Sequence, residues 1–467
     1  MVLNQTIYNL KDSYRKLTVP QFTIVTGLVI IFFGTIILSL PICSTQKVGL
    51  WEAFFTATSA ITVTGLTIVD IGKDLTFIGQ IFLALMLLTG GLGLMAITTF
   101  LQGFVVKGTK LRTRLDKGKT LDEFGVGGIG RTFRSIAITA ASIISLGSII
   151  LYSFGFLDIK NNGERLWASV FHSISAYNNA GFSLWSSSLY EYRSNILVNM
   201  VFIILIILGG LGWRVIDDIW NNRRNLRYRK LSLHSRLVIR TTLYLILFGS
   251  LGFFITESLL NGLFFNNLNF FQRLLSALFE TVSARTAGFT NYSISLDTIS
   301  DTGLLLLMTL MFIGASTGGT GGGIKTTTFM ALMAATRSTL RGQKDVIISN
   351  RLISDKVILK AVGITVGSLL FVLLMAMLLS TTNTFVEKEK FTFLEMLFTC
   401  ISAFATVGFD IGLTSKLNHF GQLILIIGMF VGRLGILLFL SAVWEALYKS
   451  RMDKQKRIGY PKADLYV

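Results

Sequence analysis

Long apolar runs alternate with more polar connections along the whole of this 467-residue chain. Most of the runs carry about 20 residues, the length that a helix needs to cross the hydrocarbon core of a bilayer. They cover residues 20–42, 75–106, 135–157, 194–213, 241–256, 302–324, 361–386 and 420–444. The pattern predicts an all-α polytopic membrane protein with eight transmembrane helices. Only Arg433 interrupts the last run.

Each pair of runs encloses a shorter apolar segment that ends at a turn containing glycine. Such a segment is too short to span the bilayer and is typical of a re-entrant helix. All four copies share a Phe, three further residues, a Ser-Ala pair and a turn that reaches Gly-Phe or Gly-Leu, and the third turn is one residue shorter. The copies are WEAFFTATSAITVTGLT (51–67), LWASVFHSISAYNNAGFS (166–183), LLSALFETVSARTAGFT (274–290) and LEMLFTCISAFATVGFD (394–410).

The chain is therefore expected to repeat one unit of span, pore helix, glycine turn and span. Two crossings return the chain to the same side, so all copies insert in parallel around an axis along the membrane normal. We expect four parallel repeats around a pseudo-fourfold axis, with four re-entrant pore helices. The expected boundaries are an N-terminal segment 1–19, repeat 1 at 20–106, repeat 2 at 107–220, repeat 3 at 221–336, repeat 4 at 337–448 and a tail 449–467.

The four glycine turns then face one another at one depth, which predicts a pore. A ring of backbone carbonyls can replace the hydration shell of a monovalent cation. The turns carry no carboxylate, which disfavours a divalent site. The alternative is that glycine merely permits close helix packing. The residues expected to form this selectivity filter are Thr62, Val63, Thr64 and Gly65; Asn178, Asn179, Ala180 and Gly181; Thr286, Ala287 and Gly288; and Ala405, Thr406, Val407 and Gly408.

Composition and charge agree with a membrane location. The chain is 52% hydrophobic and 15% charged, and its mean hydropathy is +0.64. The net charge of +18 is concentrated near both termini and in every second connection, as the positive-inside rule describes. Both termini are therefore expected in the cytoplasm of a multi-pass protein in the cell membrane. This distribution also argues against a nucleic-acid partner. The first run lacks the cleavage site of a signal peptide.

With TVTGL, NNAGF, RTAGF and ATVGF in its four turns, the chain resembles the Trk/Ktr/HKT superfamily of potassium transporters from residue 20 to about residue 449. It is most similar to the membrane subunit of bacterial Ktr systems, since the first span starts by Pro20 and the tail RIGYPKADLYV is short. The resemblance implies potassium uptake, sodium dependence, a homodimer and a separate cytoplasmic ring of nucleotide-binding (RCK-type) subunits. A glycine in all four turns is the family's potassium-selective pattern. Sodium-selective plant relatives have serine at the position of Gly65.

The stretch GASTGGTGGGIKTTT (314–328) holds six glycines in its first ten residues. A phosphate-binding loop requires lysine directly after the last glycine, but Ile324 follows Gly323 here, so ATP hydrolysis is not expected. The family resemblance instead implies an intramembrane gating loop beneath the filter. Arg433 is expected to bond to carbonyls of this loop and to hinder cations, because a charge inside a span marks a functional site. The residues assigned to the gate are Gly314, Ser316, Thr317, Gly318, Gly319, Thr320, Gly321, Gly322, Gly323, Lys325 and Arg433.

Several alternatives stay open at this point. Lys325 either joins the gate or extends to the cytoplasmic interface, and Asp410 either attracts cations or caps a helix. A sodium or mixed Na⁺/K⁺ transporter has the same architecture, and sodium is either co-transported or an activator. A non-conducting membrane enzyme or assembly protein is disfavoured because no catalytic constellation stands out. Two cysteines and three scattered histidines predict neither disulfides nor a metal site, and no covalent cofactor is expected. The substrate that the family resemblance implies is K⁺.

Overall fold

The structure, a computed structural model, describes residues 19–45, 48–93, 126–223, 230–260, 263–265, 268–292, 298–381 and 391–441. The N-terminal segment up to residue 18, the basic connection at 107–119 and the tail 449–467 lie outside these residues. Expectations about those three segments stay predictions.

The first half of the described chain contains two successive groups of helices. In each group, a first helix precedes a helix whose C-terminal half is buried, a turn and a further helix. The first group consists of α2 (Val19–Leu38), α3 (Leu50–Thr62), α4 (Ile71–Asp74), α5 (Phe77–Leu88) and the π-helical turn η1 (Thr89–Gly93). The second consists of α8 (Val126–Ile150), η2 (Leu151–Gly155), α9 (Asn162–Asn178), η3 (Tyr190–Tyr192), α10 (Ile196–Leu211) and α11 (Trp213–Asn221).

The second half repeats this order of elements. The third group consists of α12 (Leu233–Leu259), η6 (Leu263–Phe265), α13 (Phe270–Ala284), α14 (Asp301–Phe312) and α15 (Thr326–Leu340). The fourth consists of α16 (Asp355–Thr381), α17 (Phe393–Phe404), η7 (Thr414–Lys416) and α18 (His419–Leu434). Between them lies a hairpin of β1 (Ile347–Ile348) and β2 (Arg351–Leu352), in which Ile347 pairs with Leu352.

Corresponding helices begin at corresponding polar residues. In α5, α10, α14 and α18 the residue before the helix accepts a hydrogen bond from the backbone N–H three positions on. This is an N-cap, which satisfies one of the backbone donors left free at a helix start. The capping residues are Thr76, Asn195, Ser300 and Asn418.

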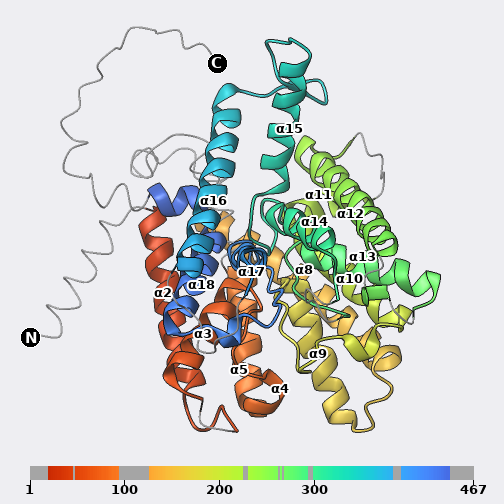
Figure 1. Cartoon of the computed structure of the whole chain (residues 1–467), viewed down its shortest axis with the longest axis vertical. Helices are drawn as coiled ribbons and strands as arrows, with labels where there is room; N and C mark the ends of the chain where they lie inside the picture. Colours follow the sequence, from red (N-terminus) through yellow and green to blue (C-terminus); the bar gives the residue numbers. More distant parts are fainter. Residues whose placement is uncertain are drawn as a thin grey trace, which may run out of the picture.

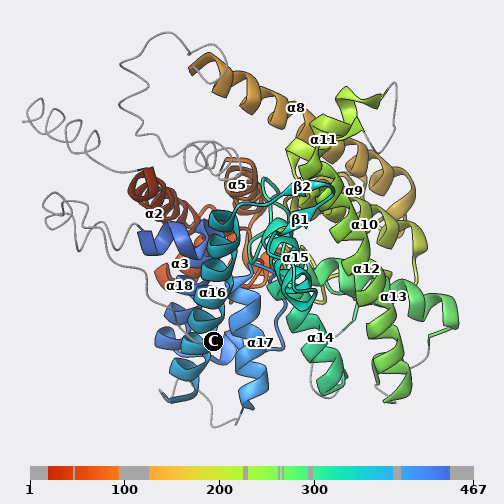
Figure 2. The ribbon, with the colours of Figure 1, turned by 90° about the horizontal axis from the view of Figure 1, so that it is seen from above.

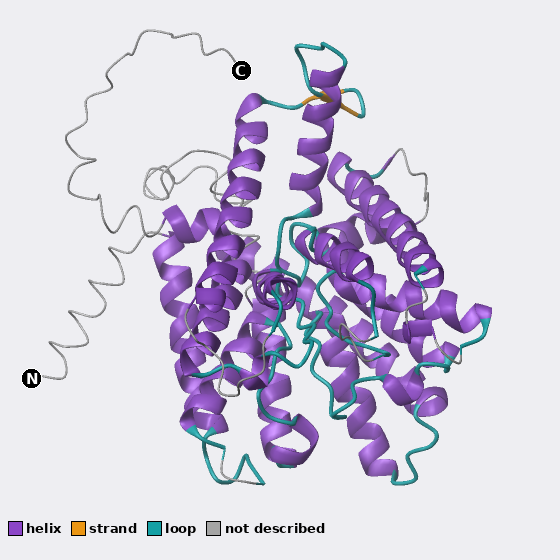
Figure 3. Cartoon of the chain, in the orientation of Figure 1, coloured by secondary structure: helices purple, strands orange, loops and turns teal. Residues whose placement is uncertain are grey.

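The groups follow one another around the middle of the molecule. Figure 2 shows the first group beside the second, the second beside the third, and the fourth next to the first. The middle itself is filled by loops, with the helices around them (Figure 3). Helices α15 and α16 extend beyond the other helices on one side, with the hairpin at their tips (Figure 1).

The described helices include three that are long and apolar enough to cross a membrane, or four if the bent pair α10 and α11 forms one span. The three are Arg134–Gly155, Leu233–Leu259 and Asp355–Thr381. Other apolar helices are shorter, and α10 meets α11 at an angle of 94° at Gly212, whose φ is 83°. The expected total of eight spans stays a prediction.

The outer faces of the long helices are apolar. Phe32 on α2, Phe248 on α12 and Leu370 on α16 are each 62% to 69% exposed. Large apolar side chains exposed together in this way mark a surface that contacts lipid or protein. The core lies inside, where the halves of the short helices that lead into the turns are buried.

Candidate ion pathway

The four glycine turns share one backbone conformation. In each turn, φ is positive at the glycine and again two residues before it, a left-handed conformation that L-residues other than glycine adopt only at a cost. The glycine φ angles are 98° at Gly65, 70° at Gly181, 74° at Gly288 and 92° at Gly408. The preceding residues have φ of 56° at Val63, 57° at Asn179, 100° at Thr286 and 51° at Thr406.

Contacts between the turns close into a ring. A Cβ atom added to any of the four glycines would lie within 3 Å of a carbonyl oxygen of the next turn. The distances are 2.4 Å from Gly65 to Ala180 O, 2.8 Å from Gly181 to Ala287 O, 2.1 Å from Gly288 to Val407 O and 2.1 Å from Gly408 to Thr64 O. Because the last contact returns to the first turn, the four turns surround a common centre. Any side chain at these glycines would displace backbone of a neighbouring turn.

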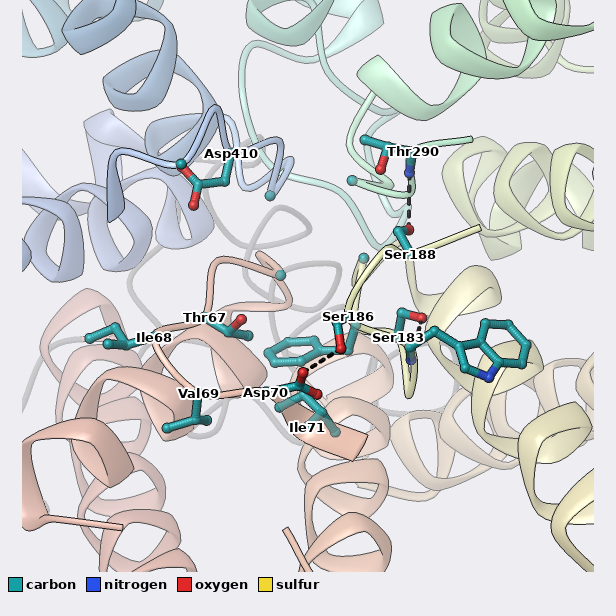
Figure 4. Close-up of a pocket in the computed structure, with 17 residues that line it drawn as sticks. Thr67, Ile68, Val69, Asp70, Ile71, Ser183, Ser186, Ser188, Thr290 and Asp410 are labelled. Atoms are coloured by element: carbon teal, nitrogen blue, oxygen red, sulfur yellow. Dashed lines mark hydrogen bonds between the residues drawn. The ribbon is translucent and has the colours of Figure 1, made fainter. Parts of the chain in front are cut away.

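A cavity of about 430 Å³ opens on one face of this ring. All four glycines line it, together with Asp70, Asp410 and several hydroxyl-bearing residues (Figure 4). The hydroxyl of Ser186 donates to Asp70 Oδ2 at 2.5 Å, and this bond joins the first and second groups of helices. The cavity therefore presents oxygen atoms and two carboxyl groups to whatever approaches the ring.

The pKa values of the two carboxyl groups shift in opposite directions. Burial alone raises the pKa of Asp70, but hydrogen bonds from Ser186 and Lys73 and the Lys73 charge outweigh it, so this pKa lies below its ordinary value. Burial raises the pKa of Asp410 despite hydrogen bonds from the N–H groups of Thr414 and Leu413. Asp410 Oδ1 accepts the N–H groups of Leu413 and Thr414 at the start of η7, and the residue also lines the cavity, so both interpretations of this residue fit the structure.

The glycine-rich stretch is an irregular loop on the opposite face of the ring. Helix α14 ends at Phe312 and α15 begins at Thr326, so the helix of the apolar run 302–324 ends before the glycine-rich stretch. The loop reaches three of the four turns: Thr320 hydrogen-bonds with the Asn179 side chain at 3.0 Å, and Gly322 N–H donates to Thr406 Oγ1 at 2.9 Å. A Cβ on Gly321 would lie 2.1 Å from Thr286 Oγ1, so only glycine lets the loop lie this close.

The loop is also bonded to the end of α10. Backbone N–H of Ser316 donates to Gly210 O at 3.1 Å, and the Ser316 hydroxyl donates to Leu211 O. Thr317 and Thr327 hydroxyls lie 2.9 Å apart and connect the loop to the start of α15. Gly318 has φ of 86° and Gly323 has φ of 66°, so the loop bends sharply at both glycines.

Two basic side chains bind loop carbonyls beneath the ring. Arg433 is buried, and its guanidinium donates to Thr320 O and, at 2.7 Å, to Gly90 O of the first group. Lys325 Nζ donates to Gly321 O at 2.6 Å, which favours the loop over the membrane interface as its location. The carboxylates nearest to the end of α10, Asp217 and Asp218, make no ion pair with Arg433 and instead accept hydrogen bonds from Asn221 and Asn222.

Arg285 is a third basic residue at this site, and sequence reasoning missed it. It follows α13 inside the third turn, is only 8% exposed, and donates through its guanidinium to Gly314 O at 3.4 Å. The available signal was a charged residue in a turn whose counterparts are all uncharged. With Arg433 and Lys325 it places three positive charges around the loop.

Other predicted filter residues have side chains with local hydrogen bonds or take part in a helix end. The Thr62 and Thr64 hydroxyls are 2.8 Å apart, and the Asn178 side chain donates to Ile174 O rather than to the centre. Ala405 forms the C-cap of α17. Among the described residues no three His, Cys, Asp or Glu side chains are grouped to hold a metal ion.

The geometry of ring, cavity and loop can be compared with known proteins. A family model described as TrkH, cation transport protein, matches residues 8–445. The chain belongs to this family. It is 34% identical to the Ktr system potassium uptake protein B of Bacillus subtilis, over 97% of this chain and 98% of the relative. It is 33% identical to the potassium/sodium uptake protein NtpJ of Enterococcus hirae, over 98% and 99%.

A solved structure has the same fold. The potassium transporter TrkH from Vibrio parahaemolyticus superposes with a TM-score of 0.72, covering 90% of this chain and 83% of that one at 17% identity. The chain is thus a predominantly helical membrane protein of a cation transport family and not an enzyme, and its resemblance to the Trk/Ktr/HKT superfamily is confirmed.

Proposed function

We propose that this protein takes up potassium through a single pore at the centre of the four glycine turns. The observation that carries the proposal is the closure of these turns into a ring by contacts between successive glycines. The names of the relatives support potassium as the ion: the Bacillus subtilis protein is a potassium uptake protein, and the Enterococcus hirae protein is a potassium/sodium uptake protein.

In this proposal the carbonyl groups of the turns are the selectivity filter and replace the water around a dehydrated cation. Each pore helix (α3, α9, α13 and α17) ends where a turn begins, so the negative end of its dipole lies next to the filter. The turns contain no carboxylate, so a monovalent ion is bound by neutral oxygens and weakly enough to leave the filter again. The cavity with Asp70 and Asp410 is the outer mouth, where negative charge concentrates cations.

The loop beneath the ring is the gate. It lies against three turns, and an ion that leaves the filter inward meets Gly321 and Gly322 directly. The guanidinium groups of Arg433 and Arg285 and the ammonium group of Lys325 add an electrostatic barrier while they hold loop carbonyls. Opening then requires the loop to exchange these hydrogen bonds for others. In this proposal, four parallel repeats, each with two spans and one re-entrant pore helix, surround the filter and the loop.

The regulatory parts of the proposal concern partners. Both termini lie in the cytoplasm, the protein works as a homodimer, and a cytoplasmic RCK-type ring binds the nucleotide that moves the loop. Four exposed basic residues lie along α15, the hairpin and the connection between them: Arg337, Arg341, Lys344 and Arg351. By the positive-inside rule, they support a cytoplasmic location for this end of the molecule. Sodium acts as an activator or as a co-transported ion.

A mixed Na⁺/K⁺ transporter is the second candidate, because the Enterococcus hirae relative is named a potassium/sodium uptake protein. Flux into liposomes that contain the purified chain, with potassium and sodium gradients run in parallel, tests both. Potassium flux well above sodium flux supports the first candidate, and equal fluxes support the second. If neither ion moves, the assay is repeated with a shortened loop, and continued absence of flux contradicts the pore.

A further inference from the structure

One position of the four pore helices differs between the repeats. It lies three residues before the serine of the shared Ser-Ala pair and is buried in every copy. The residues are Thr56 in α3, His172 in α9, Glu280 in α13 and Thr399 in α17. An imidazole and a carboxyl group are costly to bury unless they make hydrogen bonds, so the contacts of His172 and Glu280 call for an explanation.

Glu280 holds the backbone that leaves the third turn. Its Oε1 accepts the N–H of Asn291 at 2.9 Å, and the backbone of Tyr292 also donates to this carboxyl group. Asn291 lies three residues after Gly288 and directly after Thr290, which lines the cavity. Its amide nitrogen donates in turn to Asn199 Oδ1 at 3.1 Å, which extends the connection to α10.

His172 makes the equivalent contact in the second turn. Nδ1 lies 2.8 Å from Ala168 O, which can only accept, so the proton of the neutral ring is on Nδ1. Nε2 is therefore an acceptor and receives the Leu184 N–H at 3.3 Å and the Ser183 hydroxyl at 3.1 Å. Leu184 lies three residues after Gly181, the same offset as in the third turn. The ring of His172 stacks on Trp185 with centroids 4.1 Å apart.

The two threonines make no such contact. Thr399 Oγ1 donates back to Glu395 O at 3.1 Å, within its own helix. Thr56 Oγ1 has no hydrogen-bond partner in the described part of the chain. The backbone leaving the first and fourth turns is thus not bonded through this position.

The shared serines divide in the same way. In the first and fourth turns the serine hydroxyl accepts the N–H of the filter glycine, at 3.0 Å from Ser59 to Gly65 and 3.1 Å from Ser402 to Gly408. In the second and third turns it donates to the carbonyl one residue later, at 2.8 Å from Ser175 to Phe182 and 2.5 Å from Ser283 to Phe289. The serine therefore holds the second and third turns just after the glycine, and the first and fourth turns at the glycine itself.

We infer that His172 and Glu280 are positioning residues that determine ion selectivity, because each fixes by hydrogen bonds the backbone that leaves one glycine turn. Selectivity in a carbonyl-lined filter depends on the number and arrangement of the carbonyls offered to the ion. A turn whose exit is released can adjust to a smaller ion such as sodium. The inference rests on the proposed filter function and adds two residues outside the turns to it.

The test compares substitutions at the same helix position. Glu280→Leu and His172→Leu remove the acceptor, Glu280→Gln retains an acceptor oxygen without charge, and Thr56→Val and Thr399→Val are matched controls. Potassium and sodium fluxes into liposomes give the selectivity ratio. We expect each leucine variant to lower this ratio about tenfold, and Glu280→Gln and both valine variants to stay within about twofold of the parent.

An unchanged ratio in both leucine variants overturns the inference, and so does an equal loss in the threonine controls. Gly65→Ser in the same assay separates this failure from failure of the proposed function. If Gly65→Ser changes the ratio and the leucine variants do not, only the positioning role is wrong. If none of these variants changes the ratio, the filter assignment itself is wrong.

A measurement on the unsubstituted protein covers the case in which the leucine variants do not fold. Hydrogen exchange reports the opening of individual backbone N–H groups. The N–H groups of Leu184 and Asn291 are expected to exchange about tenfold more slowly than those of Ile68 and Ile411, the residues at the same offset in the other two turns. Equal exchange at all four positions contradicts the inference.

Discussion

The ring of glycine turns and the loop beneath it are both irregular backbone inside a membrane protein, but they are held by different means. The turns contact one another through backbone atoms, with no room for a Cβ at any of the four glycines. The loop also lies close to the turns, at Gly321 for example, but side chains from outside the turns and from the loop's own end add hydrogen bonds to its carbonyls, among them those from Arg433, Arg285 and Lys325. A structure fixed by close backbone contact is suited to a constant task such as ion selection. A segment held by a few exchangeable bonds is suited to move.

The largest effect is expected from a side chain in the ring. In Gly65→Ser the new Cβ would lie 2.4 Å from Ala180 O, so the first and second turns have to separate. We expect the potassium-to-sodium flux ratio to fall by tenfold or more, about 1.4 kcal/mol or above. Parallel flux measurements in liposomes check this. Gly363→Ser on α16 is the control, since a Cβ there meets nothing within 4 Å. A normal ratio in Gly65→Ser would contradict the filter assignment.

Shortening the loop is expected to change flux and leave selectivity intact. Deletion of residues 318–322 removes the segment that lies against the turns and the carbonyls that Arg433 and Lys325 bind. Basal potassium flux should rise about tenfold in the purified chain, with the potassium-to-sodium ratio unchanged. A loss of selectivity in this variant would mean that the loop belongs to the filter.

Arg433→Ala should raise basal potassium flux by a smaller factor. It removes the bonds to Thr320 O and Gly90 O and one positive charge, but leaves Arg285 and Lys325 in place. We expect an increase of about threefold to tenfold, because the electrostatic repulsion between a cation and a nearby buried positive charge amounts to several tenths to a few kcal/mol. Arg351→Ala on the exposed hairpin is the matched control. Equal flux in the two variants would exclude Arg433 from the gate.

The smallest effect is expected at the outer mouth. Asp70→Asn removes a carboxylate whose depressed pKa keeps it ionised as pH falls through the range in which an ordinary aspartate becomes protonated. Potassium uptake should drop about twofold at low ionic strength, and less at about 0.15 M salt, where the Debye length is near 8 Å. The difference between variant and parent should persist down to about pH 4, the ordinary aspartate value, and vanish only below it. Asp301→Asn, at the exposed start of α14, is the control; an equal drop there would mean that cavity charge is not involved.

Repetition made the ring predictable. The Phe, Ser-Ala and Gly pattern recurs four times, so the turns could be aligned from the sequence alone, and the density of glycine marked the loop. A polar N-cap also recurs in each of the four groups, at Thr76, Asn195, Ser300 and Asn418.

Contacts across the chain could not be predicted in the same way. Thr320 meets Asn179 across 141 positions, and Arg433 meets Gly90 across 343. Such pairs depend on how the groups are arranged around the centre, which a single sequence does not specify. The sharp bend at Gly212, where an added Cβ would lie 2.7 Å from the Gly318 backbone, depends on that arrangement too.

The most direct test of the central claim is to locate a heavier potassium analogue in crystals of the unsubstituted protein. Rubidium scatters anomalously and has nearly the size and hydration of potassium. The account predicts anomalous density inside the ring formed by Thr64, Ala180, Ala287 and Val407, next to the four glycines. Anomalous density confined to the acidic cavity, with none between the turns, would contradict the filter.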